Sequence, residues 1–258
     1  GGTLGHPNRL ALYLELVLPS CIAAMMVAQK STAKWLAAAA FAIGFAAMII
    51  TGSRGGWIAV MISLVVLFFL LVRNHHVSLW TVFKLMVLLG LILAAAVLMF
   101  YEQIESRITD DDHGSAISRI PMFQMAWSII KDHPLGGVGI NNYAVNMRQY
   151  NDTLIGRRFK TIARPVHNMY LLVTGETGVL GLAVILWLLW ATLRTLLRLV
   201  RAPSPVYSII SAGLVAGISA YLVHGLVEKH PPGGNALFFI ILAMTAAMMN
   251  QQREDGAC

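Results

Sequence analysis

Long apolar runs, separated by short polar segments, constrain the fold of this chain more than any other feature. Hydrophobic residues make up 57% of the sequence and charged residues only 12%. The apolar residues follow one another without amphipathic spacing, which is typical of helices surrounded by lipid. The sequence therefore predicts an all-α, polytopic bundle of transmembrane helices. Seven spans are expected, at Leu10 to Val27, Trp35 to Ile50, Trp57 to Val72, Val82 to Phe100, Met169 to Leu197, Val206 to Val227 and Ala236 to Met249.

The loops between these spans predict the orientation of the chain. Three of them hold basic residues and no acid: Lys30 and Lys34, then Arg73 and Lys84, then Arg194, Arg198 and Arg201. Such an excess is typical of cytoplasmic loops. Strict alternation then places residues 1–9, 51–56, 101–166 and 228–235 on the outer side. The net charge of +7 largely reflects this excess, so it does not indicate nucleic-acid binding.

The predicted organisation has three parts. Residues 1–100 form transmembrane helices 1–4, residues 101–166 an outer loop domain, and residues 167–258 transmembrane helices 5–7. Within the loop domain, the spacing of apolar residues predicts a helix from Ile117 to Ile130, and a turn rich in Gly and Pro precedes a short helix from about Tyr143 to Tyr150. The G-x-G in this turn follows no strand, so no nucleotide site is expected.

Two further observations concern the ends of the chain and its cysteines. Cys21 lies inside the first span and Cys258 ends the chain on the predicted inner side, so no disulfide or metal pair is expected. The sequence starts at Gly1 without Met and without the pattern of a signal peptide. We therefore expect that an upstream portion is missing.

Three residues on the predicted outer side have a physical case for chemistry. His167 lies where the polar loop enters the fifth span, and histidine readily exchanges a proton near neutral pH. Arg54 lies in the turn T-G-S-R-G-G-W, where Gly55 and Gly56 are expected to leave backbone N–H groups open and so form an anion site. Arg119 lies near the start of the loop helix. Two arginines and a histidine suit a diphosphate leaving group and a proton acceptor, although each also fits an anchor at the lipid headgroups or a solvated helix end.

Other polar residues are secondary candidates. Glu176 is a second candidate base, but on an unbroken helix it would lie ~13 Å from His167. Gly178 and Gly181 are expected to permit close contact between helices. The acids at 110–112 and His113 are interpreted as solvated, so no metal is expected. Residues that could line an acceptor path or support His167 are Asn168, Arg164, Glu176, His6, Asn8, Glu228 and His230.

The order of several motifs resembles the O-antigen ligase and O-antigen polymerase superfamily. These motifs are G-H-P-N-R-L-A-L-Y-L, T-G-S-R-G-G-W, S-R-I-P-M-F-Q-M-A-W, D-H-P-L-G-G-V-G-I-N-N-Y and H-N-M-Y-L-L-V-T-G-E-T-G-V-L-G. The most specific part is H-N-x9-G-x-x-G, met by His167, Asn168, Gly178 and Gly181. The resemblance implies a glycosyltransferase of the bacterial inner membrane, with its active site at the periplasmic face. It implies transfer of a glycan from undecaprenyl diphosphate to an acceptor, without metal or nucleotide.

The same resemblance implies roles for individual residues. Arg54 and Arg119 would hold the diphosphate, and His167 would lie near the acceptor hydroxyl. Phe123 stands four residues after Arg119, where the ligase signature has leucine. A ligase that uses lipid A core, a polymerase and a protein O-oligosaccharyltransferase therefore all stay open. Family members have more spans, which supports the expectation of an N-terminally truncated member.

A transporter is the alternative from a different functional class. Glu15 and Pro19 lie in the middle of the first span, and transporters place charged or helix-breaking residues there. Transporters often contain paired repeats as well, and this sequence has no such repeat. The transporter interpretation is therefore the weaker one.

Overall fold

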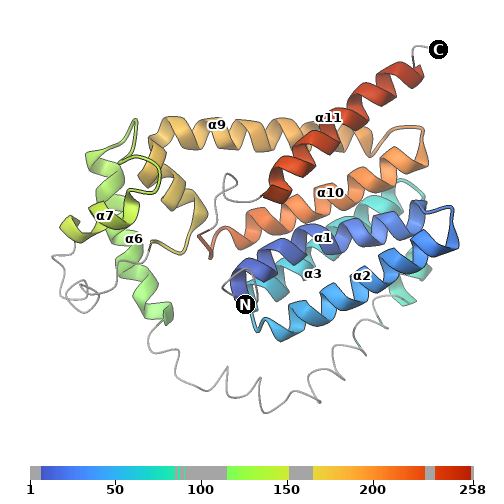
Figure 1. The fold of residues 1–258 in the computed structure, drawn as a ribbon, viewed down its shortest axis with the longest axis horizontal. Helices are drawn as coiled ribbons and strands as arrows, with labels where there is room; N and C mark the ends of the chain where they lie inside the picture. Colours follow the sequence, from blue (N-terminus) through green and yellow to red (C-terminus); the bar gives the residue numbers. More distant parts are fainter. Residues whose placement is uncertain are drawn as a thin grey trace. The chain divides into compact units, whose positions relative to one another are not determined.

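The computed structural model describes residues 7–84, 87, 90, 115–150, 165–229 and 236–256 of the 258-residue chain. These residues form helices and no strand, as the sequence predicts (Figure 1). The chain divides into two compact units. Unit 1 comprises Gly1–Asp110, Thr192–His224 and Phe239–Cys258, and unit 2 comprises Asp111–Ala191 and Gly225–Phe238.

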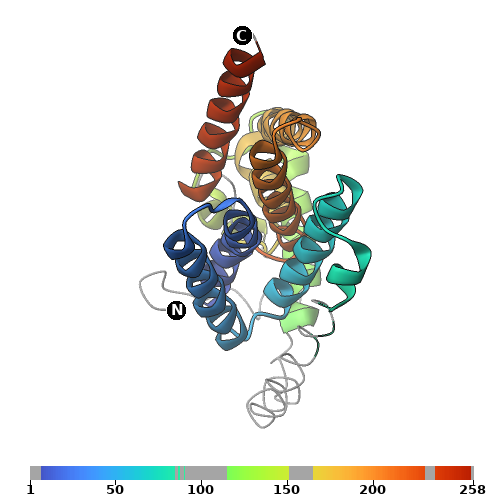
Figure 2. The ribbon, with the colours of Figure 1, turned by 90° about the vertical axis from the view of Figure 1, so that its right-hand side faces the viewer.

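Four apolar helices build the core of unit 1. They are α1 (Pro7–Val27), α2 (Ser31–Ile50), α3 (Arg54–Arg73) and α10 (Pro205–His224). Helix α10 packs against α1 and α3, and α1 also packs against α2 (Figure 2). In the most apolar stretch of α10, 67% of the residues are buried, so α10 is the central helix of this bundle.

Two glycines bring α10 into close contact with α1. A Cβ added to Gly213 would lie 2.8 Å from Cβ of Ala23, and one added to Gly217 would lie 2.9 Å from the carbonyl oxygen of Leu16. The spacing of these glycines is the G-x-x-x-G pattern, in which small residues let membrane helices approach closely. Because the earlier glycine faces the later residue of α1, the two helices are antiparallel.

The predicted spans are largely confirmed as helices. Most of them have longer ends, whereas α10 ends at His224, three residues before the predicted Val227. Helix α2 begins at Ser31 rather than Trp35. The first turn of this helix contains polar residues, which an apolar run does not include. Five of the described helices are long and apolar enough to cross a membrane, namely α1, α2, α3, α9 (Met169–Leu199) and α10. The seventh predicted span is the helix α11 (Ala236–Gly256), which ends in polar residues and is not among these five. Most of Val82 to Phe100 lies outside the described residues.

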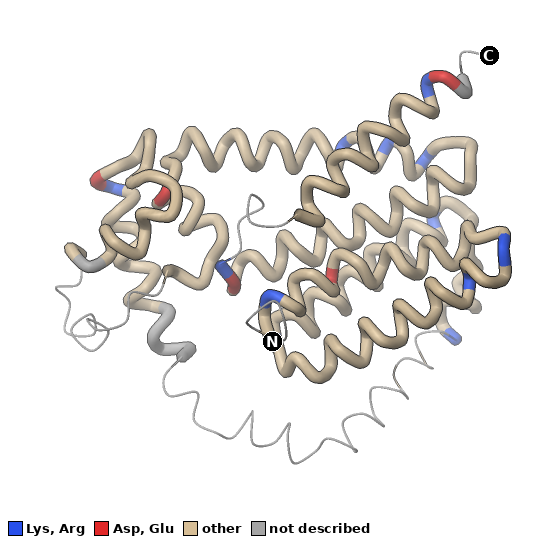
Figure 3. Tube along the Cα trace, viewed as in Figure 1, with Lys and Arg blue, Asp and Glu red and all other residues tan. Residues whose placement is uncertain are grey.

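The basic loops of unit 1 lie at one end of its bundle. His76, just after α3, places its Nε2 2.7 Å from Oγ of Ser208, near the start of α10. The end of α1 lies at the same level, because Ala23 faces Gly213. Figure 3 shows Lys and Arg gathered near helix ends. The turn before Arg54 lies at the opposite end of this bundle, as the predicted alternation requires.

Unit 2 is built on the helix predicted in the loop domain. That helix is α6 (Ser115–Asp132), which begins two residues before the predicted Ile117. It is followed by α7 (Tyr143–Asn146) and the 3₁₀ turn η2 (Met147–Tyr150), where the sequence predicts one short helix. Their common core consists of Met122, Met125, Ala126, Ile129, Tyr143, Met147, Val166 and Leu172.

Candidate functional site

Helix α9, which follows His167, contains a break that the sequence analysis did not predict. Gly178 has φ 69° and ψ −177°, so two helical segments, 169–177 and 179–199, meet there. An unbroken helix of 31 residues would be ~46 Å long, well beyond the ~30 Å of a bilayer core. The segment after the break is long enough to span alone, so the fifth predicted span is in fact two helices.

A turn from the loop domain fills this break. The backbone N–H groups of Val138 and Gly139 donate to the carbonyl oxygens of Gly175 and Glu176, at 2.9 and 2.8 Å. Beyond the break, the N–H of Val179 donates to the carbonyl oxygen of Pro134 at 2.8 Å. Backbone hydrogen bonds therefore join the glycine-rich turn to the part of α9 that contains the glycines of the H-N-x9-G-x-x-G motif.

Glycine is required on both sides of this interaction. A Cβ on Gly178 would lie 2.0 Å from the carbonyl oxygen of Leu135, and one on Gly137, at φ +64°, would lie 2.3 Å from the carbonyl carbon of Glu176. A Cβ on Gly181 would meet Oγ1 of Thr177 at 2.1 Å. The prediction that Gly178 serves contact between helices is therefore wrong, because its close neighbour is the backbone of a turn.

Glu176 and Tyr143 connect the first segment of α9 to the start of α7. The Glu176 carboxylate accepts hydrogen bonds from the backbone N–H groups of Asn141 and Tyr143, at the start of α7. The Tyr143 ring is fully buried, and a Cβ on Gly175 would lie 2.8 Å from it. Burial, and then the nearby Glu176 carboxylate, raise the pKa of the Tyr143 hydroxyl, which therefore stays protonated at neutral pH. These contacts give Glu176 a role in joining α9 to α7.

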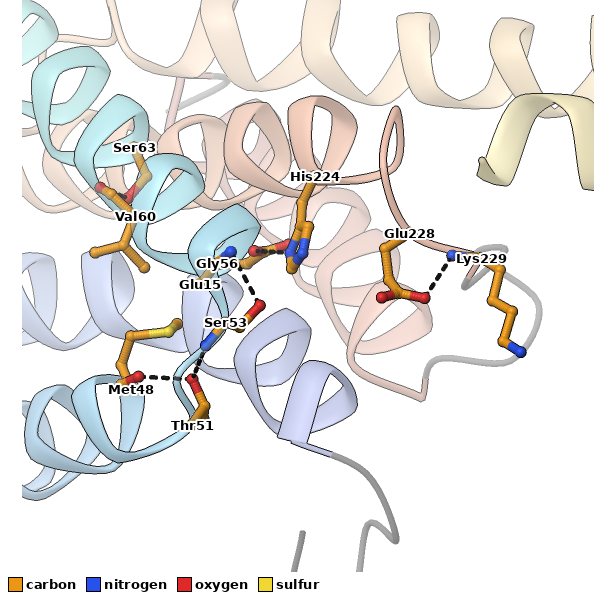
Figure 4. A network of polar contacts seen from close by, with 10 residues as sticks. All are labelled: Glu15, Met48, Thr51, Ser53, Gly56, Val60, Ser63, His224, Glu228 and Lys229. Atoms are coloured by element: carbon orange, nitrogen blue, oxygen red, sulfur yellow. Dashed lines mark hydrogen bonds and ion pairs between the residues drawn. The ribbon is translucent and has the colours of Figure 1, made fainter. Parts of the chain in front are cut away.

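His167 lies at the head of α9 beside a buried acid. Its Nδ1 is 3.3 Å from Oε1 of Glu228, and the His167 side chain is 26% exposed while that of Glu228 is 4% exposed. The same Oε1 accepts a hydrogen bond from the backbone N–H of Lys229 at 2.9 Å (Figure 4). This pairing could not be predicted from the sequence, because nothing in the local sequence relates Glu228 to a histidine so far away along the chain.

Asn168 fixes the backbone next to His167. Its Oδ1 accepts from the N–H of Leu171 at 2.9 Å, which caps the first turn of α9, and its Nδ2 donates to the carbonyl oxygen of Leu226 at 3.0 Å. The N–H of Met169 donates to the carbonyl oxygen of Gly225 at 2.7 Å. The segment 225–228 therefore lies along the head of α9 and presents Glu228 to His167.

The turn before α3 differs from its predicted form. Arg54 is exposed and is the first residue of α3, and the preceding Ser53 caps the helix by accepting from the N–H of Gly56 at 3.2 Å. A Cβ on Gly56 would lie 2.7 Å from Cβ of Ala11. The prediction that Gly56 leaves its N–H open for an anion is therefore wrong. This glycine instead allows α3 to pack against α1.

Replacing Ser53 by alanine is expected to lower the stability of unit 1 by about 1 kcal/mol, because the cap on the N–H of Gly56 is lost. The measurement is unfolding of the purified protein in detergent, followed by circular dichroism. Ser219→Ala is the matched control, since that hydroxyl, among the described residues, bonds only the carbonyl oxygen of Val215 in its own helix. Equal effects of the two variants would contradict the capping role.

The other predicted residues are distributed as follows. Asn8 lies in α1 near the Arg54 turn of unit 1, whereas His167, Asn168 and Glu176 lie in unit 2. Arg119 lies in α6, and its side chain is outside the described part of the structure. Three further candidates and the 110–113 cluster lie outside the described residues; the three are His6, Arg164 and His230. Where the structure describes side chains, no group of three metal-ligating residues is found.

A second buried pair lies inside the helices of unit 1. Oε2 of Glu15 on α1 is 2.8 Å from Nδ1 of His224 on α10, and both side chains are almost fully buried (Figure 4). Among the described atoms, Oε1 of Glu15 has no hydrogen-bond partner. Glu15, the mid-span acid that supports the transporter interpretation, is thus paired with a histidine of a neighbouring helix. This pairing accounts for the burial of the acid without a transport pathway.

The comparisons with known proteins agree with the motifs. The family model described as O-antigen ligase matches residues 38–186, which is more than half of the chain. The match contains Arg54, Arg119, His167 and the break at Gly178, and it ends before Glu228. No curated protein matches the chain. The chain therefore belongs to the O-antigen ligase family, whose members are multi-pass bacterial membrane enzymes that resemble glycosyltransferases and act on glycans and lipid-linked substrates.

Proposed function

We propose that this protein transfers a glycan from undecaprenyl diphosphate to an acceptor sugar, with lipid A core as the acceptor, as an O-antigen ligase does. The observation that carries the proposal is that His167 is held at the head of α9 and its side chain is partly exposed. The adjoining Asn168 and Met169 fix its backbone by hydrogen bonds. A proton acceptor held in place and open to substrate is what such a transfer needs.

The proposed reaction is a direct displacement at the anomeric carbon. His167 accepts the proton of the acceptor hydroxyl as its oxygen forms a bond to that carbon. The bond from the carbon to the phosphate oxygen breaks, and its electron pair leaves with undecaprenyl diphosphate. Arg54 and Arg119 stabilise the charge that grows on the departing diphosphate. Attack from the side opposite the leaving group inverts the anomeric configuration, and no step uses a metal.

Supporting roles follow for the remaining residues. Asn168 and Glu176 both bond backbone groups, so we assign them to holding the head of α9. Asn8, His6, Arg164 and His230 are proposed to line the acceptor path. We propose a location in the inner membrane with this site at the periplasmic face. The orientation is supported by the basic loops of unit 1, which share one end while the Arg54 turn lies at the other.

The first test is glycan transfer in cells that lack their own O-antigen ligase and express this protein. His167→Ala is expected to lower transfer to lipid A core by ~10²–10⁴-fold, the usual contribution of a positioned base. Arg54→Ala is also expected to abolish detectable capping. The measurement is the fraction of lipid A core that carries glycan, at equal expression of all variants.

Two matched controls separate the site from general damage. His75→Asn changes an exposed histidine whose φ of 59° asparagine tolerates, and Arg73→Ala removes the exposed arginine at the other end of α3. Both are expected to keep full transfer. Longer free glycan chains without capping would instead identify a polymerase, and glycosylated protein would identify a protein O-oligosaccharyltransferase. Full capping by His167→Ala would overturn the assigned base.

A further inference from the structure

We propose that Glu228 is the positioning residue for His167: its carboxylate holds the imidazole with the proton on Nδ1 and leaves Nε2 as the atom that accepts the proton of the acceptor hydroxyl. This inference rests on His167 being the base of the proposed transfer. Glu228 lies beyond the residues matched by the family model, so the match itself gives it no role.

The side chains of Glu228 and His167 differ in their exposure. The Glu228 side chain is 4% exposed, whereas the His167 side chain is 26% exposed, and Nδ1 faces Oε1 at 3.3 Å. Nδ1 therefore faces the acid, and the side chain keeps some exposed surface. Nε2 is the ring nitrogen that does not face Glu228, so we assign the contact with the substrate hydroxyl to it.

Glu228 is itself held in place by backbone hydrogen bonds. Oε1 of Glu228 also accepts from the backbone N–H of Lys229 at 2.9 Å (Figure 4). The backbone of segment 225–228 is fixed in turn to the two residues after His167, through Asn168 with Leu226 and through Met169 with Gly225. A carboxylate with so little freedom defines the orientation of the ring beside it, which is what positioning requires.

The carboxylate of Glu228 also selects the tautomer of the His167 ring. A neutral imidazole carries one N–H, and the hydrogen bond made by one nitrogen decides which nitrogen keeps the lone pair. A carboxylate beside Nδ1 favours the N–H there, so the lone pair is on Nε2. When Nε2 takes the proton, the ring becomes positive and the same carboxylate stabilises it. Glu228 thus acts on both the orientation and the charge of the base without contacting the substrate.

The test compares three substitutions at Glu228 in the full protein, with transfer measured in membranes at varied acceptor concentration. Glu228→Gln keeps the size and an acceptor oxygen but removes the charge, and it is expected to lower kcat by about 10- to 100-fold with KM unchanged. Glu228→Leu removes both and is expected to lose more. Glu228→Asp is expected to restore part of the rate. Val227→Ala, an exposed neighbour in the same segment, is the matched control and is expected to keep the wild-type rate.

A second measurement uses the unaltered protein, so it stands even if a variant fails to fold. In protein labelled with ¹⁵N-histidine, the signal that His167→Ala removes is expected to show that the neutral form of the ring carries its proton on Nδ1. A proton on Nε2 instead would overturn the inference. So would wild-type kcat in both Glu228→Gln and Glu228→Leu while His167→Ala is inactive. If His167→Ala is itself active, the proposed function fails first, and the two failures are thereby distinguished.

Discussion

Replacing Gly178 by alanine is expected to lower the stability of unit 2 by more than about 4 kcal/mol, which places it among the most damaging single substitutions. Alanine at φ 69° costs roughly 1–2 kcal/mol in backbone strain alone. The new Cβ would also lie 2.0 Å from the carbonyl oxygen of Leu135 and 2.6 Å from the N–H nitrogen of Gly136. Backbone atoms cannot move aside as a flexible side chain does, so the turn would have to leave the break.

The chain supplies a close control for this substitution. Gly136 lies in the same turn, but a Cβ added there meets no atom within 4 Å, so Gly136→Ala is expected to change stability little. Hydrogen–deuterium exchange of the purified protein in detergent measures the effect directly, through the protection of segments 134–139 and 169–179. Similar protection in both variants would show that the docked turn does not stabilise unit 2.

Replacing His224 by alanine is expected to lower the stability of unit 1 by about 3–5 kcal/mol, because one partner of a buried pair is removed and the other remains. The Glu15 side chain is 0% exposed and its Oε1 already has no partner among the described atoms, so the loss of Nδ1 of His224 would leave both carboxylate oxygens unpaired. Unfolding in detergent by added sodium dodecyl sulfate, followed by circular dichroism, measures the change.

A double variant tests whether the penalty arises from the unpaired acid. Glu15→Leu together with His224→Leu removes both polar groups, and most of the lost stability is expected to return, since apolar pairs often replace buried ion pairs well. His76→Ala is the control, because that imidazole is only partly buried and its partner Ser208 also bonds the carbonyl oxygen of Val200. An equal loss in the single and double variants would contradict the assigned pair.

The helices of this protein could be predicted from the sequence because their signal is local. Apolar runs of sufficient length identify α1, α2, α3, α9 and α10, whatever their neighbours are. The break in α9 is different. Gly178 fits both a continuous helix and a kink, and the choice is made by a turn about forty residues earlier in the chain. A single sequence does not contain that pairing.

In the candidate site, too, the local features could be predicted from the sequence and the long-range contacts could not. His167 and Asn168 belong to one short motif, so they could be named from the sequence. Glu228 lies in a separate turn, and only the fold brings it to His167. At the Arg54 turn the glycines predict an anion site. In the structure, however, the Ser53 hydroxyl accepts the hydrogen bond of the Gly56 N–H, and the absence of a side chain on Gly56 leaves room for Ala11. Glycine patterns alone do not tell a ligand contact from a packing contact.

The break at Gly178 also determines which part of the molecule carries His167. The short segment 169–177 is bonded to the 134–139 turn on one side and to the 225–228 segment on the other. His167 is thereby attached to the loop domain through backbone hydrogen bonds, and not only through the helix that follows it. Substitutions in the 134–139 turn can consequently change the orientation of the imidazole, although they lie far from it in the sequence.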